Sequence, residues 1–160
     1  MHPVHRLMAG ALGPLNTLCL HASSAEAIMS KENEALVRRA VEAYRRGDAA
    51  GLLELVHPDL EWTYLNPEDP DPQPQVCHGR DQLAWGLDHQ ARQGLATNVE
   101  EVTSAGDNVV VVGRTPGADH HRAWHNGDRT ILVLTVGDGQ IVAMRAFRDR
   151  EQARRFAGLD

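Results

Sequence analysis

The stretch TILVLTVGDGQIVAMRAFR, residues 130–148, decides the fold. Two runs rich in branched apolar residues, Thr130–Val136 and Gln140–Arg148, flank the tripeptide Gly137-Asp138-Gly139. Glycine and aspartate between two such runs are typical of a hairpin turn, because they adopt the backbone angles that tight turns require. The sequence therefore predicts a pair of antiparallel strands near the C-terminus.

The same pattern extends toward the N-terminus. Thr97–Ser104 and Asn108–Arg114 are apolar runs on either side of an Ala-Gly-Asp-Asn turn, which predicts a second hairpin. Apolar and polar residues alternate over Leu60–Tyr64, as in a half-buried strand. Between these strands, residues 66–75 (NPEDPDPQPQ) carry four prolines and three acids, and they are expected to form an exposed loop.

Helical spacing precedes the first strand. Ser30 is expected to cap a helix that ends at Gly47, and Asp48 to cap a shorter helix that Pro58 ends. The apolar residues that follow the helical period in the longer helix are Leu36, Val37, Ala40, Val41 and Tyr44. A third helix is expected over Gly79–Gly94.

A last short helix is expected from Asp149, whose spacing to Gln152 fits a capping box. Helices first and strands afterwards predict an α+β fold with one domain over residues 29–160. Residues 1–28 carry no net charge and are placed outside this domain, as a disordered extension, a mis-started N-terminus or a weak signal-like segment.

Composition excludes several classes of partner. The chain has 160 residues and a net charge of −6, which argues against binding nucleic acid or an anionic membrane surface. No apolar run reaches the roughly 20 residues of a membrane span. Cys19 and Cys77 lie far apart and form no disulfide framework, so a reducing, cytoplasmic location is expected.

Motifs for several catalytic chemistries are absent from the sequence. It contains no glycine-rich phosphate loop, no HExxH and no Gly-x-Ser-x-Gly elbow, and no cofactor is expected. Asp119, His120, His121 and His125 form the one metal-like cluster. No fourth ligand has diagnostic spacing, so no metal is expected, and a metal-dependent variant is kept as an alternative.

Four motifs occur in an order that resembles a known family. They are HPDLEW (57–62), HGRDQL (78–83), GDNVVVVGR (106–114) and GQIVAMRAFRDREQA (139–153). Their order is similar to the SnoaL-like branch of the nuclear transport factor 2-like superfamily, over roughly Met29 to Leu159. This resemblance implies a cone-shaped, curved antiparallel sheet wrapped by three to four helices, a ligand cavity inside the cone, and a homodimer. Polyketide cyclases, ketosteroid isomerases, epoxide hydrolases and dehydratases share the fold, so fold alone does not choose an activity.

The ketosteroid isomerase pattern can be compared position by position. The resemblance places that family's oxyanion-hole tyrosine at Ala40, its base aspartate at Tyr64 and its protonated aspartate at Ile131. Isomerisation needs a carboxylate base and two hydrogen-bond donors, and this chain has none of them at those positions. Ketosteroid isomerase activity is therefore not expected.

The same register implies which side chains face the interior of the cone. Tyr64, His125 and Arg129 are the candidate catalytic residues, with the first two as proton carriers. The residues expected to line the ligand pocket are Trp62, Leu83, Leu87, Val110, Val112, Arg114, Val133, Met144, Ala146 and Arg148. Such a pocket suits a partly apolar ligand with an anionic or enolisable oxygen.

Two functions follow from this set. The first is a cofactor-independent isomerase, cyclase or hydrolase, in which Arg114 and Arg129 would stabilise a developing oxyanion. The second is a ligand-binding or dimerisation module without catalysis, which the missing carboxylates favour. The sequence leaves the choice between them open.

Overall fold

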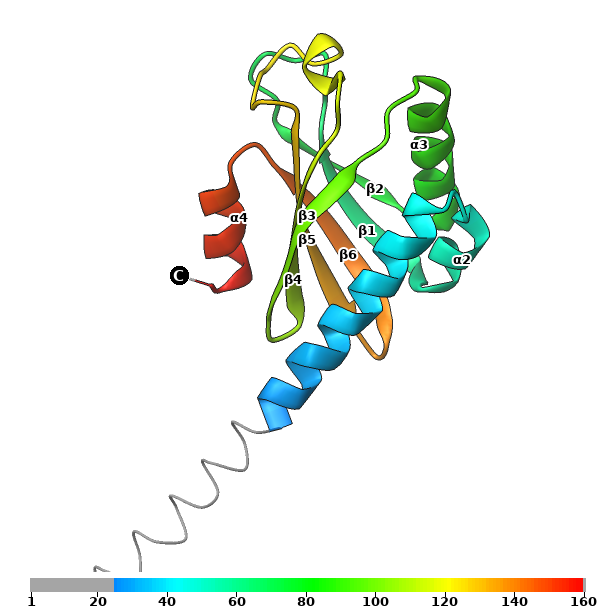
Figure 1. Ribbon diagram of the computed structural model, residues 1–160, viewed down its shortest axis with the longest axis vertical. Coiled ribbons are helices and arrows are strands. Elements are labelled where there is room, and N and C mark those ends of the chain that lie inside the picture. The colour runs from blue at the N-terminus through cyan, green and yellow to red at the C-terminus, as the bar shows by residue number, and fades with distance from the viewer. Residues whose placement is uncertain (1–24, 160) are drawn as a thin grey trace, which may run out of the picture.

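The computed structural model describes residues 25–159, which form one α+β domain as expected (Figure 1). A long N-terminal helix occupies residues 25–45 of this part. The elements that follow are α2 (Ala49–Glu54), β1 (Val56–Leu65), β2 (Pro74–His78), α3 (Arg80–Arg92), β3 (Asn98–Ala105), β4 (Asn108–Arg114), a 3-10 turn (Ala118–His120), β5 (Arg129–Gly137), β6 (Gln140–Phe147) and α4 (Arg150–Ala157).

The six strands form one open sheet in the order β2-β1-β6-β5-β4-β3. Both predicted hairpins, β3–β4 and β5–β6, are present and antiparallel. The sheet departs from the expected antiparallel arrangement at one place, because β1 and β6 run parallel, with Trp62 opposite Met144. Parallel neighbours need a long crossover connection. Here the whole chain between β1 and β6 provides it.

Helices cover the two faces of the sheet unequally. The N-terminal helix, α2 and α3 lie on one side, and α4 lies on the other (Figure 1). The face under the three helices is called the inner face below, and the face under α4 the outer face. Leu36, Val37 and Ala40 of the N-terminal helix are buried in the inner core, as their spacing predicts.

Ser30 and Gly47, the two residues predicted to bound the N-terminal helix, have different positions in the structure. Ser30 does not cap it, because the helix already runs from residue 25, and the Ser30 hydroxyl instead donates to Ser104 Oγ at 2.9 Å. The helix ends where Gly47 adopts a φ of 72°, a left-handed conformation that glycine enters without a steric penalty. Asp48 caps α2 as predicted, accepting a hydrogen bond from the Gly51 amide at 2.9 Å.

Pro58 does not end a helix, contrary to expectation. It lies inside β1, which already begins at Val56. The pairing of β1 with β6 is irregular between Val56 and Glu61, and proline is tolerated in a strand where a bulge interrupts the ladder. The region around Val56 is fixed from outside the sheet ladder, since Arg80 Nε donates to the Val56 carbonyl at 2.8 Å.

The register of β4 and β5 differs from the expected one. Val110, Val112 and Val133 were expected to face the cavity, but they pack on the outer face against Ala153 and Ala157 of α4. The side chains that face the inner core from these strands are Val109, Val111, Leu132, Leu134 and Val136. Side chains alternate along a strand, so a shift of one residue moves the whole set to the other face.

Part of the predicted N-terminal extension lies outside the described residues. Residues 1–24 of the segment 1–28, with Cys19, belong to that part, whereas residues 25–28 belong to the N-terminal helix. Cys77 is a free thiol. Within residues 25–159, no helix has the length and apolar character needed to cross a membrane.

Candidate functional site

A cavity of about 940 Å³ lies between the inner face of the sheet and the helices that cover it. This volume is at the upper end of the roughly 300–1,000 Å³ that small-molecule sites occupy. Most of the wall is apolar. Its apolar side chains come from the N-terminal helix, α2, α3 and five strands, and include Val41, Leu52, Trp62, Leu83, Leu87, Val99, Val111, Leu132, Leu134 and Met144.

Trp62 and Tyr64 form an aromatic wall on β1. Their ring centroids lie 5.5 Å apart in a tilted arrangement that aromatic pairs favour. The Tyr64 hydroxyl donates to Gln75 Oε1 on β2 at 2.7 Å, which fixes the phenol at the cavity wall. The Trp62 ring lies so close to α3 that a Cβ on Gly86 would stand 2.8 Å from its Cη2 atom.

Three threonine hydroxyls form a chain at the cavity wall. Thr115 Oγ1 lies 2.7 Å from Thr97 Oγ1 and 2.6 Å from Thr130 Oγ1. Thr97 directly precedes β3, Thr115 directly follows β4 and Thr130 lies at the start of β5, and all three residues line the cavity. The Tyr44 hydroxyl, also in the wall, accepts a hydrogen bond from the Thr97 amide at 3.2 Å. The hydroxyls thus gather at the end of the cavity beside the β4–β5 loop.

Arg122, in the β4–β5 loop, brings a half-buried positive charge to this end. Its Nη1 donates to Asn126 Oδ1 at 2.9 Å and to the Arg129 carbonyl at 2.8 Å, and its Nη2 lies 3.4 Å from Thr130 Oγ1. The guanidinium carbon stands 4.8 Å from the centre of the Trp124 ring. Burial lowers the pKa of Arg122, and the charges of Asp119 and Asp128 partly oppose this shift.

Two aspartates hold the β4–β5 loop in shape. Asp128 Oδ1 accepts a hydrogen bond from the Asp119 amide, and Asp119 Oδ2 accepts one from the Asp128 amide at 3.0 Å. Asp128 has a φ of 61°, the left-handed region, which aspartate tolerates better than most residues. The backbone hydrogen bond from Asp119 is the largest cause of the lowered pKa of Asp128. Both carboxylates are therefore used to shape the loop.

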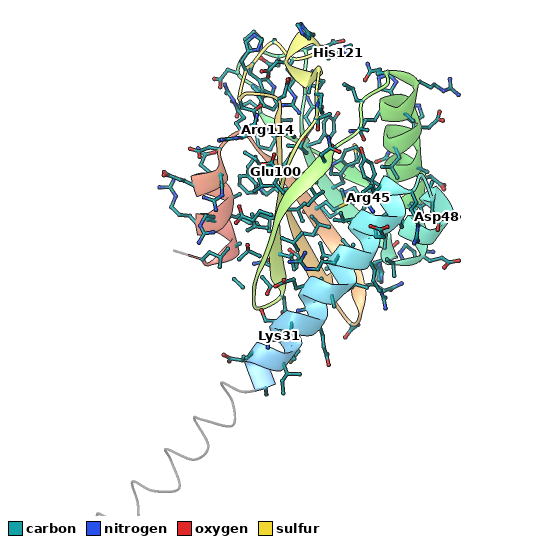
Figure 2. The ribbon with its side chains drawn as sticks, viewed as in Figure 1. Lys31, Arg45, Asp48, Glu100, Arg114 and His121 are labelled. Atoms are coloured by element: carbon teal, nitrogen blue, oxygen red, sulfur yellow. The ribbon has the colours of Figure 1, made fainter. Side chains whose placement is uncertain are left out.

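The proline-rich loop packs against the β4–β5 loop. The Ala123 amide donates to the Pro67 carbonyl at 2.7 Å, and Trp124 Nε1 donates to the Asn66 carbonyl at 3.4 Å. Trp124 is 7% exposed, so its ring is the buried centre of this contact. Glu68 and His121 line the cavity here, and both are exposed, which places them at its mouth. Figure 2 shows His121 at the tip of the molecule formed by these loops.

The structure places seven of the predicted site residues along the cavity. They are Trp62, Tyr64, Leu83, Leu87, Arg129, Met144 and Ala146. Six others do not line it: the three valines of the outer face, Arg114, His125 and Arg148.

Each of these three polar residues has a partner outside the cavity wall. Arg114 continues the outer-facing side of β4 and pairs with Glu100 at 3.3 Å (Figure 2). His125 is 69% exposed, with Nδ1 3.7 Å from Asp119 Oδ1. Arg148 pairs with Asp71 at 3.2 Å. These three side chains therefore do not line the cavity. Arg129 borders the cavity but lies opposite Arg114 in the ladder, on the outer-facing side of β5.

The sequence did not indicate Arg122 or the threonine chain. The threonine chain depends on residues that are distant in the sequence and meet only when β3, β4 and β5 are paired. Arg122 is held by residues close to it in the sequence, but its burial depends on the packing of Trp124 against the proline-rich loop. The one local signal was the Asp119–Asp128 spacing around Asn126-Gly127, which marks a braced turn. In residues 25–159 no three histidine, cysteine or acidic side chains are grouped as metal ligands.

The three positions aligned with ketosteroid isomerase residues lie at the cavity. Ala40 and Tyr64 line it, and Ile131 borders it while packing in the outer core. These positions hold methyl, phenol and alkyl groups. Among the described residues, no strand contributes a carboxylate to the cavity wall.

Solved structures with the same fold come from several bacteria. One is a nuclear transport factor 2-like protein of unknown function from Burkholderia pseudomallei, 22% identical, with a TM-score of 0.55 over 79% of this chain and 97% of that one. Another, from Sinorhizobium meliloti, is provisionally named a polyketide cyclase and is 19% identical, with a TM-score of 0.51 over 71% of this chain and 94% of that one.

A third, from Kribbella flavida, is provisionally named a ketosteroid isomerase and is 16% identical, with a TM-score of 0.53 over 74% of this chain and 78% of that one. No curated protein sequence matches the chain. At these identities the structures support the fold alone.

The sequence itself matches a family model. The model describes the SnoaL-like domain and covers residues 37–144, from the N-terminal helix to the middle of β6. The match spans more than half of the chain, and the open six-stranded sheet with its inner cavity agrees with it. The chain therefore belongs to the SnoaL-like domain family.

Proposed function

We propose that this protein binds a partly apolar small molecule with an anionic or enolisable oxygen in the inner cavity. The observation that carries this proposal is the uneven distribution of polarity around the cavity. Most of its wall is apolar, whereas the threonine hydroxyls and Arg122 gather at the end beside the β4–β5 loop. A ligand would therefore place its apolar body along Trp62 and Leu134 and its oxygen at the polar end.

The hydroxyl chain provides a donor for that oxygen. Three hydroxyl groups have three protons, and the two hydrogen bonds that join Thr97, Thr115 and Thr130 use two of them. One proton is left to donate elsewhere, and all three hydroxyls are at the cavity wall. An acceptor oxygen on the ligand would satisfy it.

Binding to a neutral fluorescent probe tests the proposal. Phenylnaphthylamine, which brightens in apolar surroundings, is expected to bind the wild-type protein. Ala146→Phe should weaken binding at least about tenfold, because Ala146 lines the cavity and the phenyl ring would fill it. Ala91→Phe is the matched control, since Ala91 is exposed on α3 and does not line the cavity. Equal binding by both variants would refute the cavity as the site.

Catalysis is a second candidate function, and the placement of Tyr64 favours it. The Tyr64 hydroxyl is held at the wall by the hydrogen bond that it donates to Gln75, so its oxygen can accept a hydrogen bond from a bound ligand, and it can donate to the ligand only in exchange for that bond. Arg129 lies opposite Arg114 in the β4–β5 ladder, on the outer-facing side of β5, so Arg122 is the arginine better placed to stabilise a developing oxyanion. His125 lies outside the wall, so Tyr64 is the better proton carrier of the two candidates.

Solvent deuterium incorporation tests this second function. Ketones with one enolisable position and an apolar body are incubated in deuterated buffer and followed by NMR. Exchange catalysed by the wild type and lost in Tyr64→Phe would support it. No exchange by the wild type would leave the binding module as the proposed function.

The family resemblance also supports a homodimer in the cytoplasm, and both remain proposals. Light scattering of the purified full chain should give twice the chain mass of 17.6 kDa for a dimer. A mass of 17.6 kDa at the highest concentration tested would refute the dimer.

A further inference from the structure

We infer that the ligand is a carboxylate and that Arg122 is its anchor. This inference rests on the proposed function and adds the chemical class of the ligand and the atoms that hold it. It does not concern Arg114, Arg129 or Arg148, the arginines that the sequence suggested.

The donors of Arg122 are used on one side only. A guanidinium has five N–H groups. Both hydrogens of Nη1 are engaged, by Asn126 Oδ1 and the Arg129 carbonyl. Nη2 has one long contact, 3.4 Å to Thr130 Oγ1, and no residue of 25–159 accepts a hydrogen bond from Nε. The Nε–Nη2 edge therefore has two unused N–H groups side by side.

Two parallel N–H groups on one edge match the two oxygens of a carboxylate. This bidentate arrangement is the strongest way in which arginine binds an oxygen anion, and a single hydroxyl or ketone oxygen cannot fill both donors. Nη1 holds the guanidinium plane in place through the backbone of Arg129, so little freedom is lost when an anion binds.

Neighbouring acids do not take this place. No carboxylate of the described chain lies within 4.0 Å of the Arg122 nitrogens. Asp119 and Asp128 are the two acids whose charges act on the pKa of Arg122. Their carboxylates accept hydrogen bonds from backbone amides of the β4–β5 loop and hold its shape. They compensate part of the positive charge, so the expected preference for an anion is moderate rather than extreme.

The cavity gives the carboxylate a defined surrounding. Arg122 and Thr130 meet at the end beside the β4–β5 loop, and the spare hydroxyl proton of the threonine chain is available at the same end. Most of the rest of the wall is apolar, and the cavity is large enough for a bicyclic body. The structure thus favours an aryl or alkyl carboxylate with its charged group inside the cavity and its apolar body along the sheet.

The experiment uses two ligands of equal shape and different charge. Naphthylacetate and naphthylacetamide are each titrated against the full chain at neutral pH, by displacement of the neutral probe phenylnaphthylamine. The wild type should bind the acid at least about tenfold more tightly than the amide, because hydrogen bonds to a charged group are stronger. Arg122→Gln should reduce this ratio to about one while still binding the neutral probe.

Two further variants separate the anchor from general charge effects. Arg155→Gln removes the same charge from α4, on the other side of the sheet, and should keep the wild-type ratio. Arg122→Lys keeps a cation without the two-donor edge, and its ratio should lie between those of the wild type and Arg122→Gln. If Arg122→Gln does not fold, the comparison of wild type with Arg122→Lys still decides the question.

The outcomes distinguish the two proposals. If the neutral probe does not bind the wild type, the proposed function fails. If the probe binds but the acid and the amide bind equally, the proposed function stands and the carboxylate inference is overturned. A preference for the acid that survives unchanged in both Arg122 variants also overturns it, because the anion would then be held elsewhere.

Discussion

The indole ring of Trp62 packs directly against the backbone of Gly86. A Cβ on residue 86 would stand 2.8 Å from Cη2 and 3.0 Å from Cζ3 of that ring, well inside van der Waals contact. Glycine at this place in α3 therefore sets how closely the helix approaches β1. It also sets the position of one aromatic wall of the cavity.

Gly86→Ala should lower the free energy of unfolding by about 1 kcal/mol, because overpacking costs about 1–3 kcal/mol and alanine regains about 1 kcal/mol in a helix. Adding Trp62→Phe should relieve the clash, so the double variant should be more stable than the sum of the two single changes predicts. Urea unfolding of the four proteins measures this coupling. Simple additivity would show that the close approach does not matter.

The hydroxyls of Thr115 and Thr130 should also be energetically coupled. Thr115 is 2% exposed, so Thr115→Val leaves buried hydroxyls without their partner and should cost about 1–3 kcal/mol. Thr130→Val in the same protein removes the partner as well, and the pair should cost less than the sum by about 1 kcal/mol. A double-mutant cycle in urea gives this value directly, and a coupling near zero would contradict the chain.

The stability of α4 should depend on Asp149. Its carboxylate accepts a hydrogen bond from the Glu151 amide at 2.8 Å, the N-cap that the sequence predicted. Asp149→Ala should cost about 1 kcal/mol, and Asp149→Ser, which can still accept that bond, should cost less. Thermal unfolding of the two variants compares them. Equal losses would mean that the cap contributes nothing.

Glu101 should contribute to the pH dependence of stability. Hydrogen bonds from Arg150 are the largest cause that lowers the pKa of Glu101 below its ordinary value of 4.5, and the Arg150 Nε lies 2.8 Å from its Oε2. A lowered pKa stabilises the fold above pH 4.5, and this contribution is lost as the pH falls through the folded-state value.

Glu101→Gln should therefore be less stable than the wild type at neutral pH and nearly equal to it in strong acid. Unfolding measured along a pH series gives the difference between the two proteins. A difference that is the same at all pH values would indicate a role for Glu101 in packing rather than in charge pairing.

The sequence predicted the helices and five of the six strands but not β2, and it was insufficient for the faces of the central strands. Residues 109–112 are four consecutive valines, and β4 is buried on both faces, against the inner core and against α4. A strand buried on both sides loses the alternation that reveals its register. The three residues assigned to the wrong face, Val110, Val112 and Val133, all lie in such strands.

Local sequence patterns did not predict the polar end of the cavity, for a different reason. Arg122 lies in a loop rich in glycine and aspartate, where a charged side chain is ordinarily exposed to solvent. What buries it is the packing of Trp124 against the proline-rich loop, a contact between segments about 58 residues apart. By contrast, Trp62 and Tyr64 were placed at the cavity by the register that the family resemblance implies, on a strand whose sequence alternates between apolar and polar residues.

The position of a bound carboxylate tests the account most directly. A crystal structure of the full chain with naphthylacetate should show both carboxylate oxygens within hydrogen-bond distance of Nε and Nη2 of Arg122, about 2.7–3.0 Å, with the naphthalene ring between Trp62 and Leu134. A ligand bound outside the cavity, or inside it with its carboxylate away from Arg122, would contradict the account.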